Sequence, residues 1–262
     1  MLTVVCCGRG APGATSTALT LAAAWPARTL MVEADPYGGD LAFRCRTPEG
    51  LALPETPTVL TAAVAARTDV SAGMLGRYAN RLNDSLGVVS GHLAAEQGSG
   101  VTDWEPLARA MAGTASTGPV IVDLGRIHGA SPSLPIAAAA DVVVVVTRAD
   151  VGSVLHLRER LARLVPVLAQ RRGWPPRIVP VVVTGRRQGA AHAQEIAELL
   201  ADTPAGPVIA GVGSIAWDPT GLERLERSAD AVGLSRTPLL KSAAKVVDLV
   251  RAAQGSAVAT HV

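Results

Sequence analysis

A glycine-rich segment near the start of the chain carries residue types that bind phosphate. Between the apolar run Leu2–Cys7 and a helix-type segment, the chain reads Gly8-Arg9-Gly10-Ala11-Pro12-Gly13-Ala14-Thr15-Ser16-Thr17. A glycine loop between a strand and a helix turns backbone N–H groups towards one point, where the helix N-terminus adds partial positive charge. The segment therefore predicts a site for a phosphate-bearing ligand.

Two phosphate-binding motifs fit this segment. Gly8, Gly10 and Gly13 match the dinucleotide fingerprint G-x-G-x-x-G, and Glu33 follows at the distance expected of a ribose-binding acid. Gly8 and Gly13 also match the P-loop pattern G-x-x-x-x-G-K-[ST], with Thr15 as the hydroxyl that binds Mg²⁺. The first motif predicts a nicotinamide-dependent oxidoreductase and the second a nucleoside triphosphate site. A tight turn without a ligand is the third alternative.

Local features favour the P-loop interpretation. Pro12 stiffens the loop, and the run Thr15–Thr17 places hydroxyls at the helix start, where a phosphate and Mg²⁺ can use them. Asp35 and Asp123 each follow an apolar run, so both carboxylates are expected at the carboxyl edge of the sheet. A dinucleotide fold does not need the hydroxyls of Thr15–Thr17.

The P-loop pattern is incomplete at one position. Ala14 stands where the motif has its lysine, and the chain has only two lysines, Lys241 and Lys245. Losing a phosphate clamp of this kind costs on the order of a hundredfold in rate. Arg9 carries charge nearby, but a planar guanidinium does not replace a lysine point charge.

Apolar runs alternate with helix-type segments along the chain, which predicts parallel strands joined by right-handed crossovers. The predicted strands are Leu2–Cys7, Thr29–Glu33, Leu86–Ser90, Val120–Leu124, Val142–Thr147, Ile178–Thr184 and Val208–Val212. The predicted helices are Thr15–Trp25, 57–67, 72–80, Trp104–Met111, Val151–Ala169, Ala190–Ala201, 220–230 and 237–253. Residues 46–57 and 96–102 are expected to be surface loops.

The expected fold is a doubly wound α/β domain, with a mostly parallel sheet of six to eight strands and helices on both faces. One domain is expected over residues 1–253, followed by a disordered tail, 254–262.

Composition excludes several classes of protein. The chain has 262 residues, of which 48% are hydrophobic and 18% charged, which excludes an intrinsically disordered chain. A net charge of +2 is too small for binding of nucleic acid or membrane by bulk electrostatics. We expect no signal peptide, no membrane-spanning segment and a cytoplasmic location. Cys6, Cys7 and Cys45 have no metal-ligand spacing, and Cys6 and Cys7 are expected in the core.

Over roughly residues 2–250, these motifs together resemble the MinD/ParA family of P-loop ATPases, whose deviant Walker A motif reads K-G-G-x-G-K-[ST]-T. The signature lysine of that family falls on Arg9 and the conventional P-loop lysine on Ala14. The family's D-x-D falls on Glu33-Ala34-Asp35, and its Walker B aspartate on Asp123. The loop bordering adenine falls on Val212–Pro219, which includes Trp217, Asp218 and Pro219.

This resemblance implies that ATP binds at Gly8–Ser16 and that Mg²⁺ is held by Thr15, Asp35 and Asp123. It also implies a homodimer formed face to face, with Arg9 reaching the partner's nucleotide and Asp35 orienting the attacking water. A protein partner is implied, in cell division, chromosome segregation or secretion and pilus localisation.

Departures from the family pattern imply weak or lost hydrolysis. Besides Ala14, the chain has Leu124-Gly125-Arg126 after Asp123, and Val183 leads into Thr184-Gly185 where the family has an adenine-contacting asparagine. The pattern is closer to divergent actinobacterial MinD-like proteins and to TadZ/CpaE pilus-localising relatives. A pseudo-ATPase scaffold that does not use nucleotide is therefore an alternative function.

Other charged residues have structural and functional alternatives. Arg171-Arg172 and Arg186-Arg187 are the first candidates for nonspecific DNA contacts, although most such pairs are merely solvated. Asp40 is either a turn residue or a switch contact, and Asp150 is expected to cap a helix. Residues 237–253 have an apolar face that predicts a packed terminal helix rather than a peripheral membrane anchor.

Overall fold

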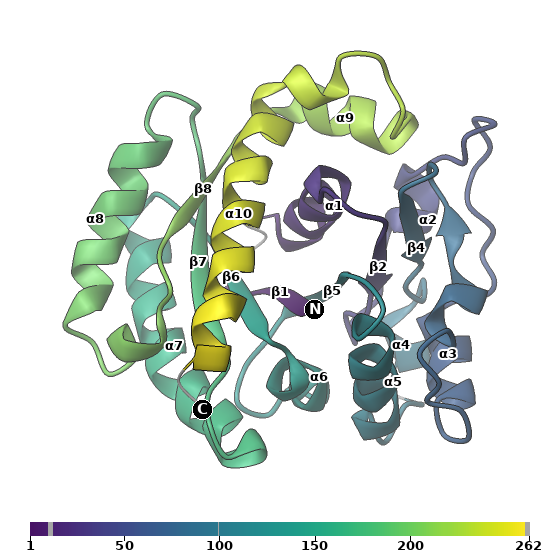
Figure 1. The fold of residues 1–262 in the computed structure, drawn as a ribbon, viewed down its shortest axis with the longest axis horizontal. Coiled ribbons are helices and arrows are strands. Elements are labelled where there is room, and N and C mark those ends of the chain that lie inside the picture. The colour runs from purple at the N-terminus through teal and green to yellow at the C-terminus, as the bar shows by residue number, and fades with distance from the viewer. Residues whose placement is uncertain (10–12, 99, 260–262) are drawn as a thin grey trace.

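The computed structural model describes residues 1–9, 13–98 and 100–259 (Figure 1). Its centre is an eight-stranded sheet in the order β3-β4-β2-β5-β1-β6-β7-β8. All neighbouring strands pair in parallel except β3 and β4, so the sheet is mostly parallel as predicted. The strands are β1 Leu2–Cys7, β2 Thr29–Glu33, β3 Asn80–Arg81, β4 Leu86–Val89, β5 Val120–Arg126, β6 Val142–Arg148, β7 Arg177–Thr184 and β8 Gly213–Ala216.

Helices cover both faces of this sheet. Those that pack on one face are α3 Val59–Ala65, α5 Glu105–Ala115, α6 Leu134–Ala139, α7 Val151–Arg172 and α8 Gly189–Ala201. Those that pack on the other face are α1 Ala14–Ala24, α2 Leu41–Arg44, α9 Pro219–Arg227 and α10 Pro238–Ala259. The short helix α4 Ala95–Gly98 lies in the connection between β4 and α5. The predicted doubly wound α/β fold is confirmed.

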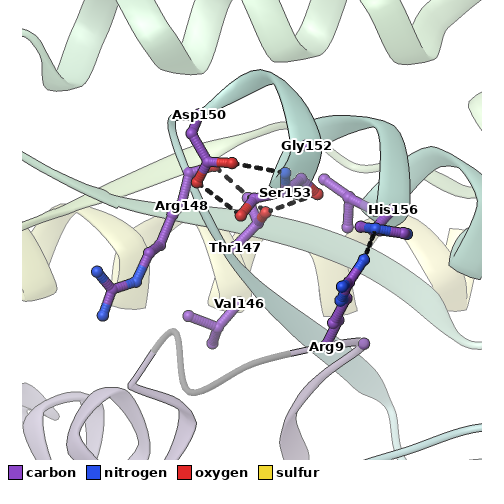
Figure 2. Close-up of a pocket in the computed structure, with 10 residues that line it drawn as sticks. Arg9, Val146, Thr147, Arg148, Asp150, Gly152, Ser153 and His156 are labelled. Atoms are coloured by element: carbon purple, nitrogen blue, oxygen red, sulfur yellow. Dashed lines mark hydrogen bonds between the residues drawn. The ribbon is translucent and has the colours of Figure 1, made fainter.

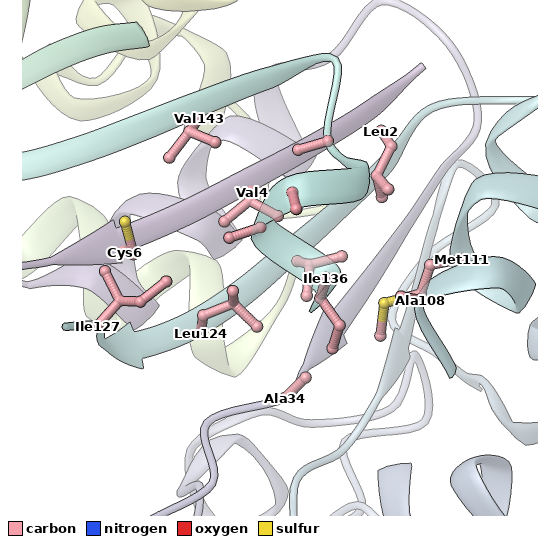
Figure 3. Close-up of a cluster of buried hydrophobic side chains, with 14 of the residues drawn as sticks. Leu2, Val4, Cys6, Ala34, Ala108, Met111, Leu124, Ile127, Ile136 and Val143 are labelled. Carbon is pink, nitrogen blue, oxygen red and sulfur yellow. The ribbon is translucent and has the colours of Figure 1, made fainter. Parts of the chain in front are cut away.

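Side chains of the central strands alternate between the two faces, as a pleated strand requires. Val4 and Cys6 of β1 point to the α5–α6–α7 side, which Figure 3 shows, while Val5 belongs to the core under α1 and α10. Both cores are apolar, so the central strands are continuous apolar runs without polar alternation. Cys6, Cys7 and Cys45 are free and buried.

The predicted strand Val208–Val212 is wrong. Val208 ends a 3₁₀ turn that begins at Gly206, and Ile209 makes only an isolated bridge with Ile178 of β7. Gly211 then takes a φ of 142°, and the ladder with β7 restarts at Gly213. These apolar residues therefore precede the edge strand β8. Because β8 occupies Gly213–Ala216, only Trp217, Asp218 and Pro219 of the predicted loop Val212–Pro219 follow the strand.

Other local predictions also fail where glycine or short length disfavours the expected element. Residues 72–80 contain a 3₁₀ segment, Leu75–Tyr78, rather than an α-helix, and Gly73 and Gly76 both lower α-helix propensity there. Asn80 then starts β3, which pairs antiparallel with β4. The predicted loop 96–102 includes most of α4, and neither α2 nor α6 was predicted.

Two predicted helix features are confirmed. Asp150 caps α7, because its Oδ1 accepts a hydrogen bond of 2.9 Å from the backbone N–H of Ser153. The predicted apolar face of α10 is buried, with Val246 and Val250 packed in the same core as α1. This helix continues past residue 253 to Ala259, while residues 260–262 of the predicted tail lie outside the described residues.

Within the described ranges, none of the helices combines the length and the apolar character that crossing a membrane requires.

Leu161→Ala tests how strongly α7 is held on the sheet. Leu161 is fully buried, so truncation removes apolar contacts and leaves a cavity, and we expect a loss of about 2–5 kcal/mol in unfolding free energy. Leu155→Ala is the matched control, because Leu155 lies on the same helix with 53% exposure and should change stability little. Urea unfolding of both variants measures the difference. Equal effects would contradict the packing of α7 described here.

Candidate functional site

The central parallel strands bring several predicted site residues to one edge of the sheet. A cavity of about 540 Å³ lies at this edge, between the start of α1 and the segments that follow β2 and β5. Its lining residues are Cys7, Gly13, Ala14, Thr15, Ser16, Asp35, Tyr37, Arg44, Gly125, Arg126 and His128. Of the predicted loop, Gly10, Ala11 and Pro12 lie outside the described residues.

The start of α1 forms the positive side of this cavity. Gly13 takes a left-handed φ of 94°, which glycine adopts without a steric penalty, and the helix begins at the next residue. No acidic residue occupies the first turn of α1, so nothing there neutralises the partial positive charge of the helix N-terminus. The arrangement suits an anion such as a phosphate.

Asp123 lies beneath the cavity with one carboxylate oxygen unsatisfied. It is fully buried on the α1 side of β5, and its Oδ1 accepts a 2.9 Å hydrogen bond from the backbone N–H of Gly125. Its Oδ2 has no hydrogen-bond partner among the described residues. Burial raises the pKa of Asp123 to about 6, while Thr15 and Gly125 act against the rise. A buried carboxylate oxygen without a hydrogen-bond partner, near the Thr15 hydroxyl that lowers the pKa of Asp123, suits Mg²⁺, which takes oxygen ligands and completes its shell with phosphate and water.

Glu33 is the register partner of Asp123 on the neighbouring strand, but its surroundings differ. Its carboxylate accepts hydrogen bonds from the backbone N–H groups of Asp40, Leu41 and Gly91, at 3.0, 3.3 and 2.8 Å. Burial raises the pKa of Glu33 to about 7, against the effect of these bonds. The carboxylate is thus committed to holding the loops after β2 and β4, which argues against a ribose-binding role.

Asp35, in contrast, reaches the cavity. Its Oδ1 accepts a 2.9 Å hydrogen bond from the backbone N–H of Tyr37, and its carboxylate packs directly on Gly125. A Cβ at position 125 would collide with that carboxylate, and the φ of 57° also favours glycine. The glycine within Leu124-Gly125-Arg126 therefore has a local structural reason. Burial raises the pKa of Asp35, partly offset by the Tyr37 N–H, His92 and Arg126.

Arg9 does not point into this cavity. Its guanidinium contacts the imidazole of His156 on α7, in a second cavity of about 350 Å³ that Figure 2 shows. Arg160 also reaches the loop from α7, and its Nη2 donates a 3.2 Å hydrogen bond to the carbonyl of Gly8. The structure thus places Arg9 on the face beside the start of α7, apart from Thr15 and Asp35.

A third cavity, of about 250 Å³, adjoins the first and is mostly apolar. It shares Gly13 and Ser16 with the first cavity, and Arg148 and Trp217 also line it. The guanidinium of Arg148 lies over the Trp217 ring, 5.6 Å from its centroid. Of the remaining predicted residues, Pro219 lines this cavity and starts α9.

Asp218 has a structural task in this region. Its Oδ1 accepts a 2.9 Å hydrogen bond from the Gly221 N–H and caps α9, and its Oδ2 accepts one of 3.3 Å from the Leu239 N–H. Its carboxylate therefore joins α9 to the start of α10.

Arg44 is the site residue that sequence reasoning missed. Its Nη2 donates a 2.9 Å hydrogen bond to Ser16 Oγ at the start of α1, although α2 is distant from α1 in the sequence. The one available signal was the spacing of Asp40 and Arg44, which pair at 2.8 Å as i,i+4 neighbours on a helix. That spacing identifies an ion pair and says nothing of Ser16.

The paired arginines separate in space. Arg172 donates to the carbonyl of Ala140 and stacks on Trp174, near the amino ends of β6 and β7. Arg186 and Arg187 follow the carboxyl end of β7 and line a different cavity, which also contains Lys241 and Lys245. The four arginines predicted as DNA contacts therefore do not form one patch.

Among the residues that the structure describes, no group of three or more His, Cys, Asp or Glu side chains forms a metal centre. A metal at Thr15 and Asp123 would depend on ligand atoms from a bound nucleotide.

The sheet order and the helices on both faces define a doubly wound α/β domain, a fold shared with ParA and MinD ATPases of known structure. Among solved structures, a ParA family ATPase from Chlorobium tepidum TLS has a TM-score of 0.71 at 16% identity, covering 94% of this chain and 98% of that one. The MinC:MinD cell division complex of Aquifex aeolicus gives 0.63 at 15% identity, covering 97% and 95%. A Cyanothece McdA variant in complex with ATP gives 0.65 at 15% identity, covering 96% of each chain.

No protein-family model and no curated protein matches the sequence. The resemblance to the MinD/ParA family is confirmed at the level of the fold.

Asp123→Asn tests the buried carboxylate through the pH dependence of stability. The folded-state pKa of about 6 lies above the ordinary 3.8, so the folded protein retains a proton that the unfolded chain loses. Wild-type stability should therefore fall as the pH rises between these values, and the neutral variant should avoid this loss. We expect the unfolding free energy of Asp123→Asn to exceed that of the wild type by about 1–3 kcal/mol at pH 8 and by little near pH 4.

Urea unfolding across this pH range measures that difference. A difference between wild type and Asp123→Asn that does not change with pH would contradict the electrostatic interpretation, because lost packing has no such dependence.

Proposed function

We propose that this chain is an ATP-binding positioning protein of the ParA/MinD type, which dimerises across its nucleotide and recruits a protein partner as a dimer. The observation that supports this best is the juxtaposition of Thr15 and the buried Asp123 beside the cavity at Gly13–Ser16. A hydroxyl, a carboxylate and a helix N-terminus at one place suit a magnesium-bound triphosphate. Neighbours of the same fold include an ATP complex, which supports this ligand class.

Each part of the nucleotide has a matching surface. The phosphates would lie against the start of α1 at Gly13–Ser16, and the base would enter the apolar cavity lined by Arg148 and Trp217. Thr15 and Asp123 would hold Mg²⁺, which neutralises phosphate charge when bound. Asp35 would accept a hydrogen bond from the attacking water, because its carboxylate reaches the same cavity.

Slow hydrolysis follows from the residues present. Ala14 offers no cation to the β- and γ-phosphates, and such a clamp acts mainly on the transition state. Slow turnover suits a protein whose nucleotide state acts as a signal, because the bound state then persists.

The proposed dimer face is the surface beside Arg9 and the start of α7. Val151 and Leu155 are exposed there, at 75% and 53%, next to the cavity that Arg9 lines. Exposed apolar side chains beside a charged residue are typical of an interface. The MinC:MinD neighbour is a complex with a second protein, which supports a partner of that kind.

A scaffold that does not use nucleotide is the second candidate, and Ala14 is the observation that favours it. The oxidoreductase alternative is not favoured, because three backbone N–H groups occupy the Glu33 carboxylate.

Thr15→Val tests the magnesium site. Losing the hydroxyl should weaken ATP binding by about tenfold with Mg²⁺ present and change it little in EDTA, since the loss acts through the metal. Titration calorimetry with ATP–Mg²⁺, ADP–Mg²⁺ and NADH measures this for both proteins. If the wild type binds no nucleotide, the scaffold function is the remaining candidate. Tight binding of NADH would instead favour the oxidoreductase alternative over an ATP-binding protein.

Arg9→Ala tests the dimer. We expect ATP to convert the wild type from monomer to dimer, and the variant to dimerise about tenfold more weakly because a cross-interface charge contact is lost. Light scattering with and without ATP–Mg²⁺ gives the mass. Arg171→Ala, which removes an exposed arginine in the last turn of α7, far along the helix from Val151 and Leu155, is the control. A wild-type mass that does not change when ATP–Mg²⁺ is added would refute ATP-dependent dimerisation.

A further inference from the structure

We infer that Arg44 supplies the phosphate-binding cation that Ala14 fails to provide, and that Glu226 and Asp40 hold this arginine in place until a nucleotide binds. The inference rests on the proposed function, since it concerns the same nucleotide site. It assigns a role to a side chain that reaches Ser16, at the start of α1, from a separate helix.

The position of Arg44 supports this role. The residue lines the cavity together with Ala14, Thr15 and Ser16, and its Nη2 lies 2.9 Å from Ser16 Oγ. A phosphate held by the N-terminus of α1 would therefore lie beside the guanidinium. Arginine suits this task because its planar fork binds phosphate oxygens through two N–H groups.

Two carboxylates hold the long, flexible side chain of Arg44 at the cavity. Nη1 donates to Asp40 at 2.8 Å, and Nε donates to Glu226 of α9 at 3.0 Å. Burial works to lower the pKa of Arg44, but the hydrogen bonds of Asp40 and Glu226 outweigh it and hold the pKa above its ordinary value. The guanidinium remains charged and only 24% exposed, with its donors already oriented.

An incoming phosphate would compete with these carboxylates for the same donors. Glu226 lies on α9, which directly follows Trp217. This competition therefore links the cavity at Gly13–Ser16, where the phosphates would bind, to the helix beside the apolar cavity, where the base would bind. Neutralising Glu226 should therefore leave more of the Arg44 charge for the phosphate.

The test compares ATP and adenosine, which differ only in the phosphates. For Arg44→Ala we expect ATP binding to weaken about ten- to a hundredfold, with adenosine binding unchanged. Arg44→Lys should retain part of the affinity, and Ala14→Lys in the Arg44→Ala background should restore it. Calorimetry measures ATP, ligand-observed NMR measures adenosine, and urea unfolding checks that each variant folds.

Glu226→Gln provides an independent test that leaves Arg44 in place. We expect it to tighten ATP binding severalfold in the wild type and to have no effect in the Arg44→Ala background, because its influence passes through the guanidinium. Arg227→Ala is the matched control, since Arg227 lies on the same helix and pairs with Glu223. This control should leave ATP affinity unchanged.

The outcomes separate the two proposals. If the wild type binds ATP and Arg44→Ala binds it equally well, the role of Arg44 is overturned and the proposed function stands. The same conclusion follows if Arg126→Ala, and not Arg44→Ala, weakens ATP binding. Equal losses for ATP and adenosine would show a purely structural role and overturn the inference. Absence of ATP binding to the wild type would refute both proposals.

Discussion

Two buried carboxylates at the ends of neighbouring strands impose the main electrostatic constraint on this protein. Glu33 and Asp123 are register partners on β2 and β5, and both are almost completely removed from solvent. Burial raises the pKa of each, and the charge of Asp123 raises that of Glu33 further. Such groups are costly unless hydrogen bonds or cations compensate them.

The two acids are compensated differently, and that difference organises the site. Glu33 receives backbone N–H groups from two loops, so it fixes the segment that carries Asp35 and Asp40 and, through α2, Arg44. Asp123 receives one backbone N–H and retains an unpaired oxygen beneath the α1 N-terminus. The first carboxylate holds two loops together, whereas the second is buried with one oxygen that has no hydrogen-bond partner among the described residues.

How much the sequence predicted depends on how local each feature is. The central strands were predictable because buried parallel strands are continuous apolar runs, and Asp35 and Asp123 followed from their places after such runs. Val208–Val212 has the same composition but lies before the strand, because Gly206 and Gly211 set a backbone that cannot pair continuously. Only the register with β7 distinguishes the two cases.

The sequence by itself determined the central parallel strands and the long helices between them, the glycine loop with its hydroxyls, and the absence of a lysine at position 14. These properties depend on residue type and on neighbours in the chain. The tertiary structure alone decided that Glu33 serves the loops, that Arg9 turns towards His156, and that Arg44 reaches Ser16. Each of these depends on contacts between distant segments, which form only when the sheet aligns the carboxyl ends of its strands.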